Sequence, residues 1–156
     1  MSKASEQVKE FHKAFSVEDA EKPTIPSLDR RIMRARLIVE EVFEFLEASG
    51  LSLKMLSTLS SKNATFYIVP MVSGLNYVTP NIVEAADALA DIKYVVEGAA
   101  LTWGIPLDEV FDEVHRSNMS KVPEDGVIIK REDGKVLKPP TYSPPNIHPI
   151  LAPSEG

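Results

Sequence analysis

Two long segments of this chain, residues 28–48 and 81–103, carry apolar and acidic residues at the spacing of an α-helix. In the first segment the acidic side chains fall within about a third of the helix circumference, because successive residues turn by about 100°. These acidic residues are Glu40, Glu41, Glu44 and Glu47. The other side of the same helix carries Val39, Val42, Phe43 and Leu46. The pattern favours an all-α fold.

The second segment repeats the acidic stripe. Glu84, Asp87 and Asp91 stand at i, i+3 and i+7, which places them on one narrow helix face. Like charges at these spacings cost a few tenths of a kcal/mol per pair in water, and more when partly buried. One such stripe is typical of a solvated helix face. Two stripes favour a magnesium site, since Mg²⁺ prefers oxygen ligands and leaves positions for water and substrate phosphates.

Start and stop signals give the boundaries of the helices. The predicted helices cover residues 5–15, 28–48, 81–103 and 107–120. Ser27 is the expected N-cap of the second helix, and Gly50 closes it. Gly104, followed by Pro106, ends the third.

Two other segments do not follow the helical period. Residues 51–80 predict an irregular insert with short strands at most, because prolines and glycines interrupt an aromatic, β-branched run. Within residues 122–156, Asp133-Gly134 is a hairpin signal, and the proline-rich end is expected to follow a surface as extended chain. The whole chain is therefore predicted to be one domain, a helical bundle of about four helices with an insert and a tail.

Composition restricts the partners and the compartment. A net charge of −6 and a pI of about 5.1 argue against a surface for duplex nucleic acid, which needs clustered Lys and Arg. The 156 residues contain no cysteine, which excludes disulfides and thiolate metal sites and fits a reducing compartment. We find no signal-peptide pattern at the N-terminus and no membrane-spanning run, so a cytoplasmic protein is expected.

Glu40-Glu41-Val42-Phe43-Glu44 matches the EExxE motif of the MazG-like all-α nucleoside triphosphate pyrophosphohydrolases. The stripe at residues 84–91 resembles the ExxD partner motif, and the run EVHRSNMSK at residues 113–121 resembles the dUTPase-like and phosphoribosyl-ATP pyrophosphohydrolase-like branch. The resemblance extends from Phe11 to Ile147 and is poorest over residues 49–80. It implies magnesium-dependent hydrolysis, with Mn²⁺ as a substitute, of a (deoxy)nucleoside triphosphate to its monophosphate and pyrophosphate. The candidate substrates are dUTP, dGTP and dCTP.

The resemblance also implies roles for the acidic residues. Glu41 and Glu44 match the metal ligands of EExxE, and Glu40 lies beside the metal and the attacking water. The second motif departs from the family pattern. Glu84 and Asp87 fit ExxD literally, whereas the position before IKYV selects Asp91 and leaves Ala88 where a Glu is expected. Asp87 and Asp91 are the preferred ligands, with Glu84 third.

Several other residues are candidates for holding the nucleotide. Asn118 and Lys121, at i and i+3, can bind phosphate oxygens, although a lysine at a helix end also compensates the helix dipole. Lys93 and Tyr94 follow the acidic stripe and can reach the nucleotide. Less specific candidates are His115 and Arg116 on the fourth helix, Lys135 and Lys138 in the tail, and the aromatic residues Phe66, Tyr67, Tyr77 and Trp103.

Two other functions fit parts of the pattern. A ferritin-like di-iron protein needs two Glu-x-x-His units, and this chain offers only Asp112-x-x-His115. A non-enzymatic helical interaction module would use the acidic residues for solvation alone. Because an open acidic groove is often completed by a second copy, as the resemblance implies, a homodimer or homotetramer is expected. The base and the sugar of the substrate do not follow from the sequence.

Overall fold

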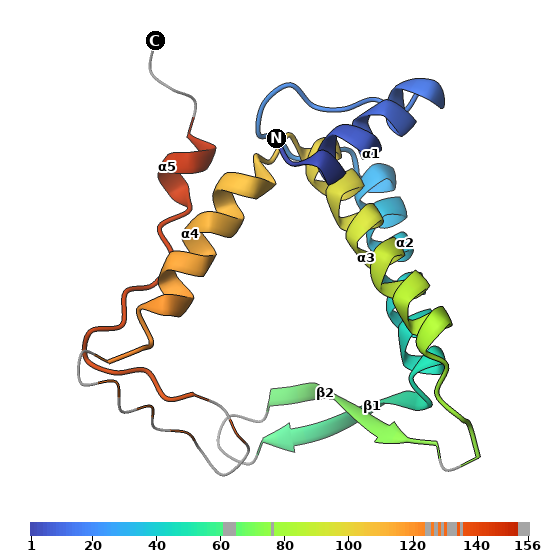
Figure 1. The fold of residues 1–156 in the computed structure, drawn as a ribbon, viewed down its shortest axis with the longest axis vertical. Coiled ribbons are helices and arrows are strands. Elements are labelled where there is room, and N and C mark those ends of the chain that lie inside the picture. Colours follow the sequence, from blue (N-terminus) through green and yellow to red (C-terminus); the bar gives the residue numbers. More distant parts are fainter. Residues whose placement is uncertain are drawn as a thin grey trace. The chain divides into compact units, whose positions relative to one another are not determined.

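The computed structural model describes residues 1–60, 65–75, 77–123, 126, 128, 130, 134 and 136–152. Within this part the chain forms five helices and one two-stranded sheet, so the all-α prediction is confirmed (Figure 1). The chain divides into two compact units. One consists of Ser27–Val96, and the other combines Met1–Pro26 with Glu97–Gly156.

Helix α2 (Leu28–Ala48) has the predicted bounds, because both of its ends carry local signals. The hydroxyl oxygen of Ser27 accepts a hydrogen bond from the backbone N–H of Arg30 at 3.5 Å, which satisfies one free donor of the first turn. At the other end Gly50 adopts a φ of +66°, a conformation that favours glycine and ends the helix.

The insert after α2 is a regular hairpin, and the prediction of an irregular segment was wrong. Strand β1 (Leu51–Ser60) pairs antiparallel with β2 (Thr65–Gly74) over their whole length, from Leu51 opposite Gly74 to Ser60 opposite Thr65. Pro70 interrupts neither strand, because each strand of a two-stranded sheet has one free edge that needs no N–H donor.

Helix α3 (Ile82–Trp103) begins beside the end of α2, and its first part runs antiparallel to α2 (Figure 1). The backbone N–H of Asn81 donates to the carbonyl oxygen of Ala48 at 2.8 Å and so joins the two ends. The side-chain oxygen of Asn81 accepts from the N–H of Val83 at 3.0 Å, which caps α3. The two acidic stripes are therefore carried by neighbouring helices.

We expect Asn81→Ala to lower the free energy of unfolding by about 1 kcal/mol, because it leaves an N–H of the first turn of α3 without its side-chain acceptor. Urea denaturation measures the change. Ser27→Ala at the start of α2 is the matched comparison, and it should cost less because its capping hydrogen bond is longer, at 3.5 Å. Equal costs for the two variants would contradict the capping role of Asn81.

In the other unit, helix α1 (Lys3–Ala14) is followed by a connection that is bonded to the end of α3. The N–H of Ala20 donates to the carbonyl of Leu101 at 2.9 Å, and the N–H of Thr24 donates to that of Trp103 at 3.0 Å. Val8 on α1 is one of the most buried side chains of the described residues, with 1 % of its surface exposed. These contacts fix the connection over the place where α3 ends.

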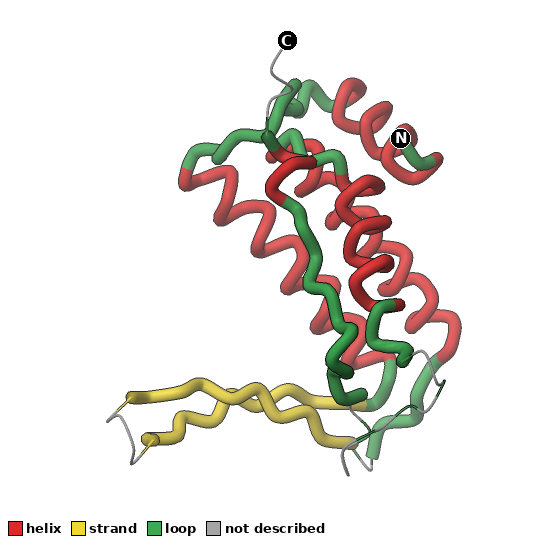
Figure 2. The backbone as a smooth tube through the Cα atoms, turned by 90° about the vertical axis from the view of Figure 1, so that its left-hand side faces the viewer, coloured by secondary structure: helices red, strands yellow, loops and turns green. Residues whose placement is uncertain are grey.

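The remaining described elements of this unit are α4 (Leu107–Met119) and the short helix α5 (His148–Leu151). The expectation of a wholly extended proline-rich end was wrong for α5, since Pro149 lies in its first turn, where proline is tolerated. Residues 137–147, the described segment directly before α5, form no helix or strand, in agreement with the expected extended chain (Figure 2). Among the described residues around Gly134, Lys130 and Val136 form an isolated antiparallel bridge, and Asp133 is outside the described residues.

Across the described residues, no helix combines the length and the apolar character that crossing a membrane requires.

Candidate functional site

The two acidic stripes face each other between α2 and the first part of α3. Partial burial is the largest of the causes that raise the pKa of Glu41 above its ordinary value of 4.5. The other causes are the negative charges of four neighbours, Glu44, Asp91, Glu40 and Asp87. Because two of these neighbours lie on each helix, the carboxylates of the predicted site are brought together as a group.

A shallow hollow lies next to this group, toward the hairpin end of the helices. Its volume is about 210 Å³, and its lining consists of Glu44, Glu47, Ala48, Glu84, Asp87 and Ala88. The small side chains of Ala48 and Ala88 are buried, which leaves room for the carboxylates at its rim. The hollow thus offers several oxygen ligands and open access from solvent.

The donor set fits a hard divalent cation, because carboxylate oxygens from two helices surround Glu41 and repel it in the absence of a positive charge. Among the described residues, however, no three Asp, Glu or His side chains are arranged as a ready-made metal site. Both Asp87 and Asp91 remain suitable, since each acts on Glu41.

Lys93 and Tyr94 differ in their relation to the acidic stripe. Tyr94 follows Asp87 by seven residues and Asp91 by three, so it shares their face of α3 and is partly exposed. Lys93 follows Asp91 by two residues, a spacing at which helix side chains do not face each other. A nucleotide contact therefore fits Tyr94 better than Lys93.

Asn118 and Lys121, the other predicted phosphate contacts, lie at the end of α4 and touch each other. The ammonium group of Lys121 donates to the side-chain oxygen of Asn118 at 2.7 Å. Asn118 is exposed and Lys121 is half-buried, so both can be reached from solvent. The bond between the two side chains was not predicted, and their role toward phosphate stays a prediction.

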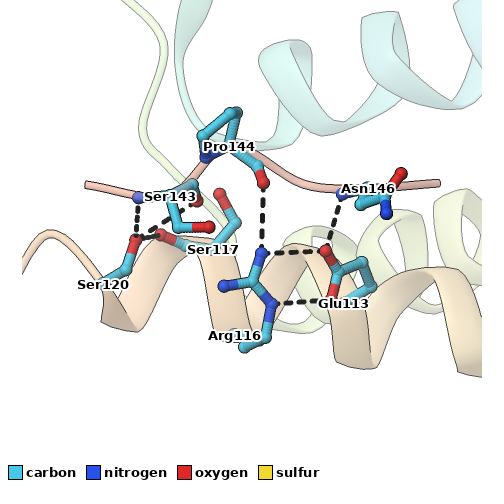
Figure 3. Close-up of polar contacts among 7 residues, drawn as sticks. All are labelled: Glu113, Arg116, Ser117, Ser120, Ser143, Pro144 and Asn146. Carbon is cyan, nitrogen blue, oxygen red and sulfur yellow. Dashed lines mark hydrogen bonds and ion pairs between the residues drawn. The ribbon is translucent and has the colours of Figure 1, made fainter. Parts of the chain in front are cut away.

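The tail is fastened along α4 by a group of polar contacts that the sequence did not reveal (Figure 3). Arg116 donates two hydrogen bonds to the carboxylate of Glu113, at 2.7 and 2.9 Å, and one to the carbonyl of Pro144 at 3.1 Å. The N–H of Asn146 donates to Glu113 at 2.6 Å, and the N–H of Ser143 donates to the hydroxyl of Ser120 at 2.9 Å. Arg116, a weak nucleotide-binding candidate, therefore holds the tail.

These contacts predict how the tail responds to acid. The hydrogen bond from Arg116, followed by that from the Asn146 N–H, lowers the pKa of Glu113 from 4.5 to about 2. Because the folded-state pKa is lowered, the stabilisation is present above pH 4.5 and is lost as the pH falls through about 2. We expect faster hydrogen exchange at Asn146 as the pH falls through this window, after correction for the intrinsic rate. Glu113→Gln should remove the pH dependence, and its persistence in that variant would contradict the assignment.

The less specific candidates differ in their exposure to solvent. His115 is an exposed residue of α4, and Tyr77 has 84 % of its surface exposed. Trp103 is half-buried at the end of α3. The side chains of Phe66 and Tyr67, and the whole of Lys135, are outside the described residues.

Comparison with protein families gives one finding that covers most of the chain. Residues 8–118 match the family model described as phosphoribosyl-ATP pyrophosphohydrolase. The matched range contains both acidic stripes and ends within α4, before the tail. The comparison with curated proteins finds no match.

Proposed function

The chain belongs to the phosphoribosyl-ATP pyrophosphohydrolase family, within the MazG-like all-α NTP pyrophosphohydrolase superfamily, and from this membership we propose that it hydrolyses a (deoxy)nucleoside triphosphate to the monophosphate and pyrophosphate. The family establishes a pyrophosphohydrolase that acts on nucleotide-like substrates. The single observation that supports the proposed reaction is the group of carboxylates around Glu41, which comes from two helices and contains the EExxE glutamates.

We propose Mg²⁺ as the cofactor, with Mn²⁺ as a substitute. Its ligands would be Glu41, Glu44, Asp87 and Asp91, with Glu84 available at the rim of the hollow. When bound, the cation supplies neutralisation of phosphate charge and a lower pKa for the attacking water. The raised pKa of Glu41 supports this proposal, because a cation would offset the repulsion among its neighbours.

The remaining residues would bind the nucleotide and orient the attacking water. Glu40 is exposed next to Glu41 and can accept a proton from the attacking water or hold it in line. Asn118 and Lys121 can donate to oxygens of the departing pyrophosphate. Lys93 and Tyr94 are the proposed contacts to the rest of the nucleotide, with Tyr94 favoured by its position on the acidic face.

We further propose that the protein acts as a homodimer or homotetramer on free nucleotides in the cytoplasm. The support for an oligomer is the apolar side of α2, on which two large side chains are exposed: Val39 is 50 % exposed and Phe43 is 49 % exposed. The absence of cysteine fits a reducing compartment. Light scattering tests the oligomer, and a fully active monomer would contradict it.

The reaction is tested with a panel of NTPs and dNTPs, including dUTP, dGTP and dCTP, with Mg²⁺ or Mn²⁺ and with EDTA as the control. Phosphoribosyl-ATP belongs in the same panel, because the matching family carries its name. Monophosphate and pyrophosphate from one nucleotide, abolished by EDTA, would support the proposal and identify the base. Turnover of phosphoribosyl-ATP alone would replace the proposed substrate, and no turnover of any compound would contradict the proposed function.

A further inference from the structure

The described tail brings a lysine and a tyrosine to the end of α4. The ammonium group of Lys138 lies 4.3 Å from the centre of the Tyr142 ring. The Tyr142 hydroxyl is hydrogen-bonded to Ser117, which is the largest cause of its lowered pKa, and the positive charges of Lys138 and Lys121 lower that pKa further. The positive charges of two ammonium groups therefore act on one hydroxyl group. One of these lysines, Lys121, is also bonded to the side-chain oxygen of Asn118.

Within the described part of the chain, the positive charge at this place has no acidic partner. Among the described residues, neither Lys121 nor Lys138 forms an ion pair with a carboxylate, whereas the neighbouring Arg116 is fully engaged with Glu113. A position at the helix end explains Lys121 through the helix dipole. Lys138 comes from the tail and lies over the Tyr142 ring, a contact that orders the ammonium group and leaves its charge in place. In a protein with a net charge of −6, two like charges converging on one hydroxyl favour an anionic ligand.

The tail contacts hold this group in place. Immediately after Tyr142, the N–H of Ser143 is bonded to Ser120 and the carbonyl of Pro144 to Arg116. Tyr142 is half-buried, and Lys138 and Asn118 are exposed, so the donors are ordered and still accessible. A site whose donors are fixed before binding loses less entropy when the ligand arrives.

We propose that Lys138 and Tyr142 complete, with Lys121 and Asn118, a binding site for the phosphate chain of the substrate. This inference rests on the proposed function, and it adds the tail, which lies beyond the family match, to the substrate-binding residues. Two ammonium groups, a phenol and an amide supply donors from several directions, which suits the oxygens of linked phosphate groups.

The test is calorimetric titration with inorganic tripolyphosphate in the presence of Mg²⁺, which needs no turnover. We expect Lys138→Gln to weaken tripolyphosphate binding about tenfold and Tyr142→Phe to weaken it about threefold, because each removes one donor to a charged ligand. Lys138→Arg should keep most of the affinity. Lys130→Gln is the matched control, an exposed lysine of the same tail, and its affinity should stay within about twofold of the wild type.

Measurements of KM and kcat, compared with tripolyphosphate affinity, distinguish a failure of this inference from a failure of the proposed function. With an active nucleotide, Lys138→Gln should raise KM about tenfold and change kcat much less, because its contact is made before the reaction. If no nucleotide is hydrolysed but tripolyphosphate affinity still falls in Lys138→Gln, the site stands and the proposed function fails. Unchanged affinity and KM in folded Lys138→Gln and Tyr142→Phe variants would overturn the inference, and so would orthophosphate binding as tight as that of tripolyphosphate.

Discussion

Replacing Glu41 with Gln is expected to lower pyrophosphate release by about 10²- to 10³-fold, the scale seen when one electrostatic group is removed from a catalytic site. Glutamine keeps the shape of the side chain but removes the charge at the centre of the acidic group. The same change should stabilise the metal-free protein near neutral pH, because it removes the repulsion between Glu41 and the neighbouring carboxylates. This repulsion destabilises the wild type by a few tenths of a kcal/mol per pair. Steady-state kinetics and thermal melting with EDTA measure the two effects.

The stability that Glu41→Gln adds to the metal-free protein should increase with pH. Because the folded-state pKa of Glu41 is raised, its native form binds a proton more readily than the unfolded chain does. The difference between wild type and Glu41→Gln should therefore be small below pH 4.5 and grow as the pH rises through the raised pKa. Added Mg²⁺ should raise the melting temperature of the wild type more than that of the variant.

Glu109→Gln is the matched control, since Glu109 is an exposed glutamate of α4 outside the acidic group. It should leave turnover within about twofold and show no gain in stability in EDTA. A Glu41→Gln enzyme that keeps more than half of the wild-type kcat would show that the carboxylate group is not the catalytic site.

Gly104→Ala is expected to destabilise the protein by about 2–5 kcal/mol and to lower its melting temperature by about 10 °C. Gly104 ends α3 with a φ of +64°, where a side chain is strained. An added Cβ would also overlap the carbonyl group of Lys22, in the connection that is bonded to the end of α3. The variant must therefore both strain the helix end and displace the connection, and urea denaturation measures the sum.

Gly74→Ala is the control for this substitution. Gly74 ends strand β2, its φ is not positive, and no atom lies within 4 Å of an added Cβ. We expect a change of less than about 0.5 kcal/mol. If the two glycine variants were equally stable, the tight approach of Lys22 to the end of α3 would be wrong.

The helices were predictable because their ends carry local signals. Ser27, Gly50 and Gly104 set boundaries that the structure reproduces, since capping depends on residues within a few positions of the helix end. The convergence of the acidic stripes also followed from the sequence, because side chains at i, i+3 and i+7 share one helix face. The sequence did not show that the charges of both Asp87 and Asp91 raise the pKa of Glu41.

Other features depend on contacts between segments that are far apart in the sequence, which a local pattern does not identify. Pro70 and Gly74 looked like interruptions, although the alternation of Leu51, Ser52 and Leu53 is a strand signal and an edge position accommodates the proline. The attachment of the tail joins Arg116 to Pro144, 28 residues along the chain, and no periodicity connects them. The open apolar side of α2 was likewise unpredictable, because the same spacing also describes a packed face.

The hairpin of β1 and β2 is an arm whose first and last residues lie side by side. Leu51 stands opposite Gly74, and the N–H of Leu75 donates to the carbonyl of Gly50 at 2.7 Å, so the two ends of the hairpin are bonded to each other. Residues removed in equal number from the tips of β1 and β2 leave every remaining pair in register. The spacing of α2 and α3, and with it the acidic group, is thus independent of the length of this arm, which makes the arm a natural place for evolution or for a protein engineer to exchange sequence.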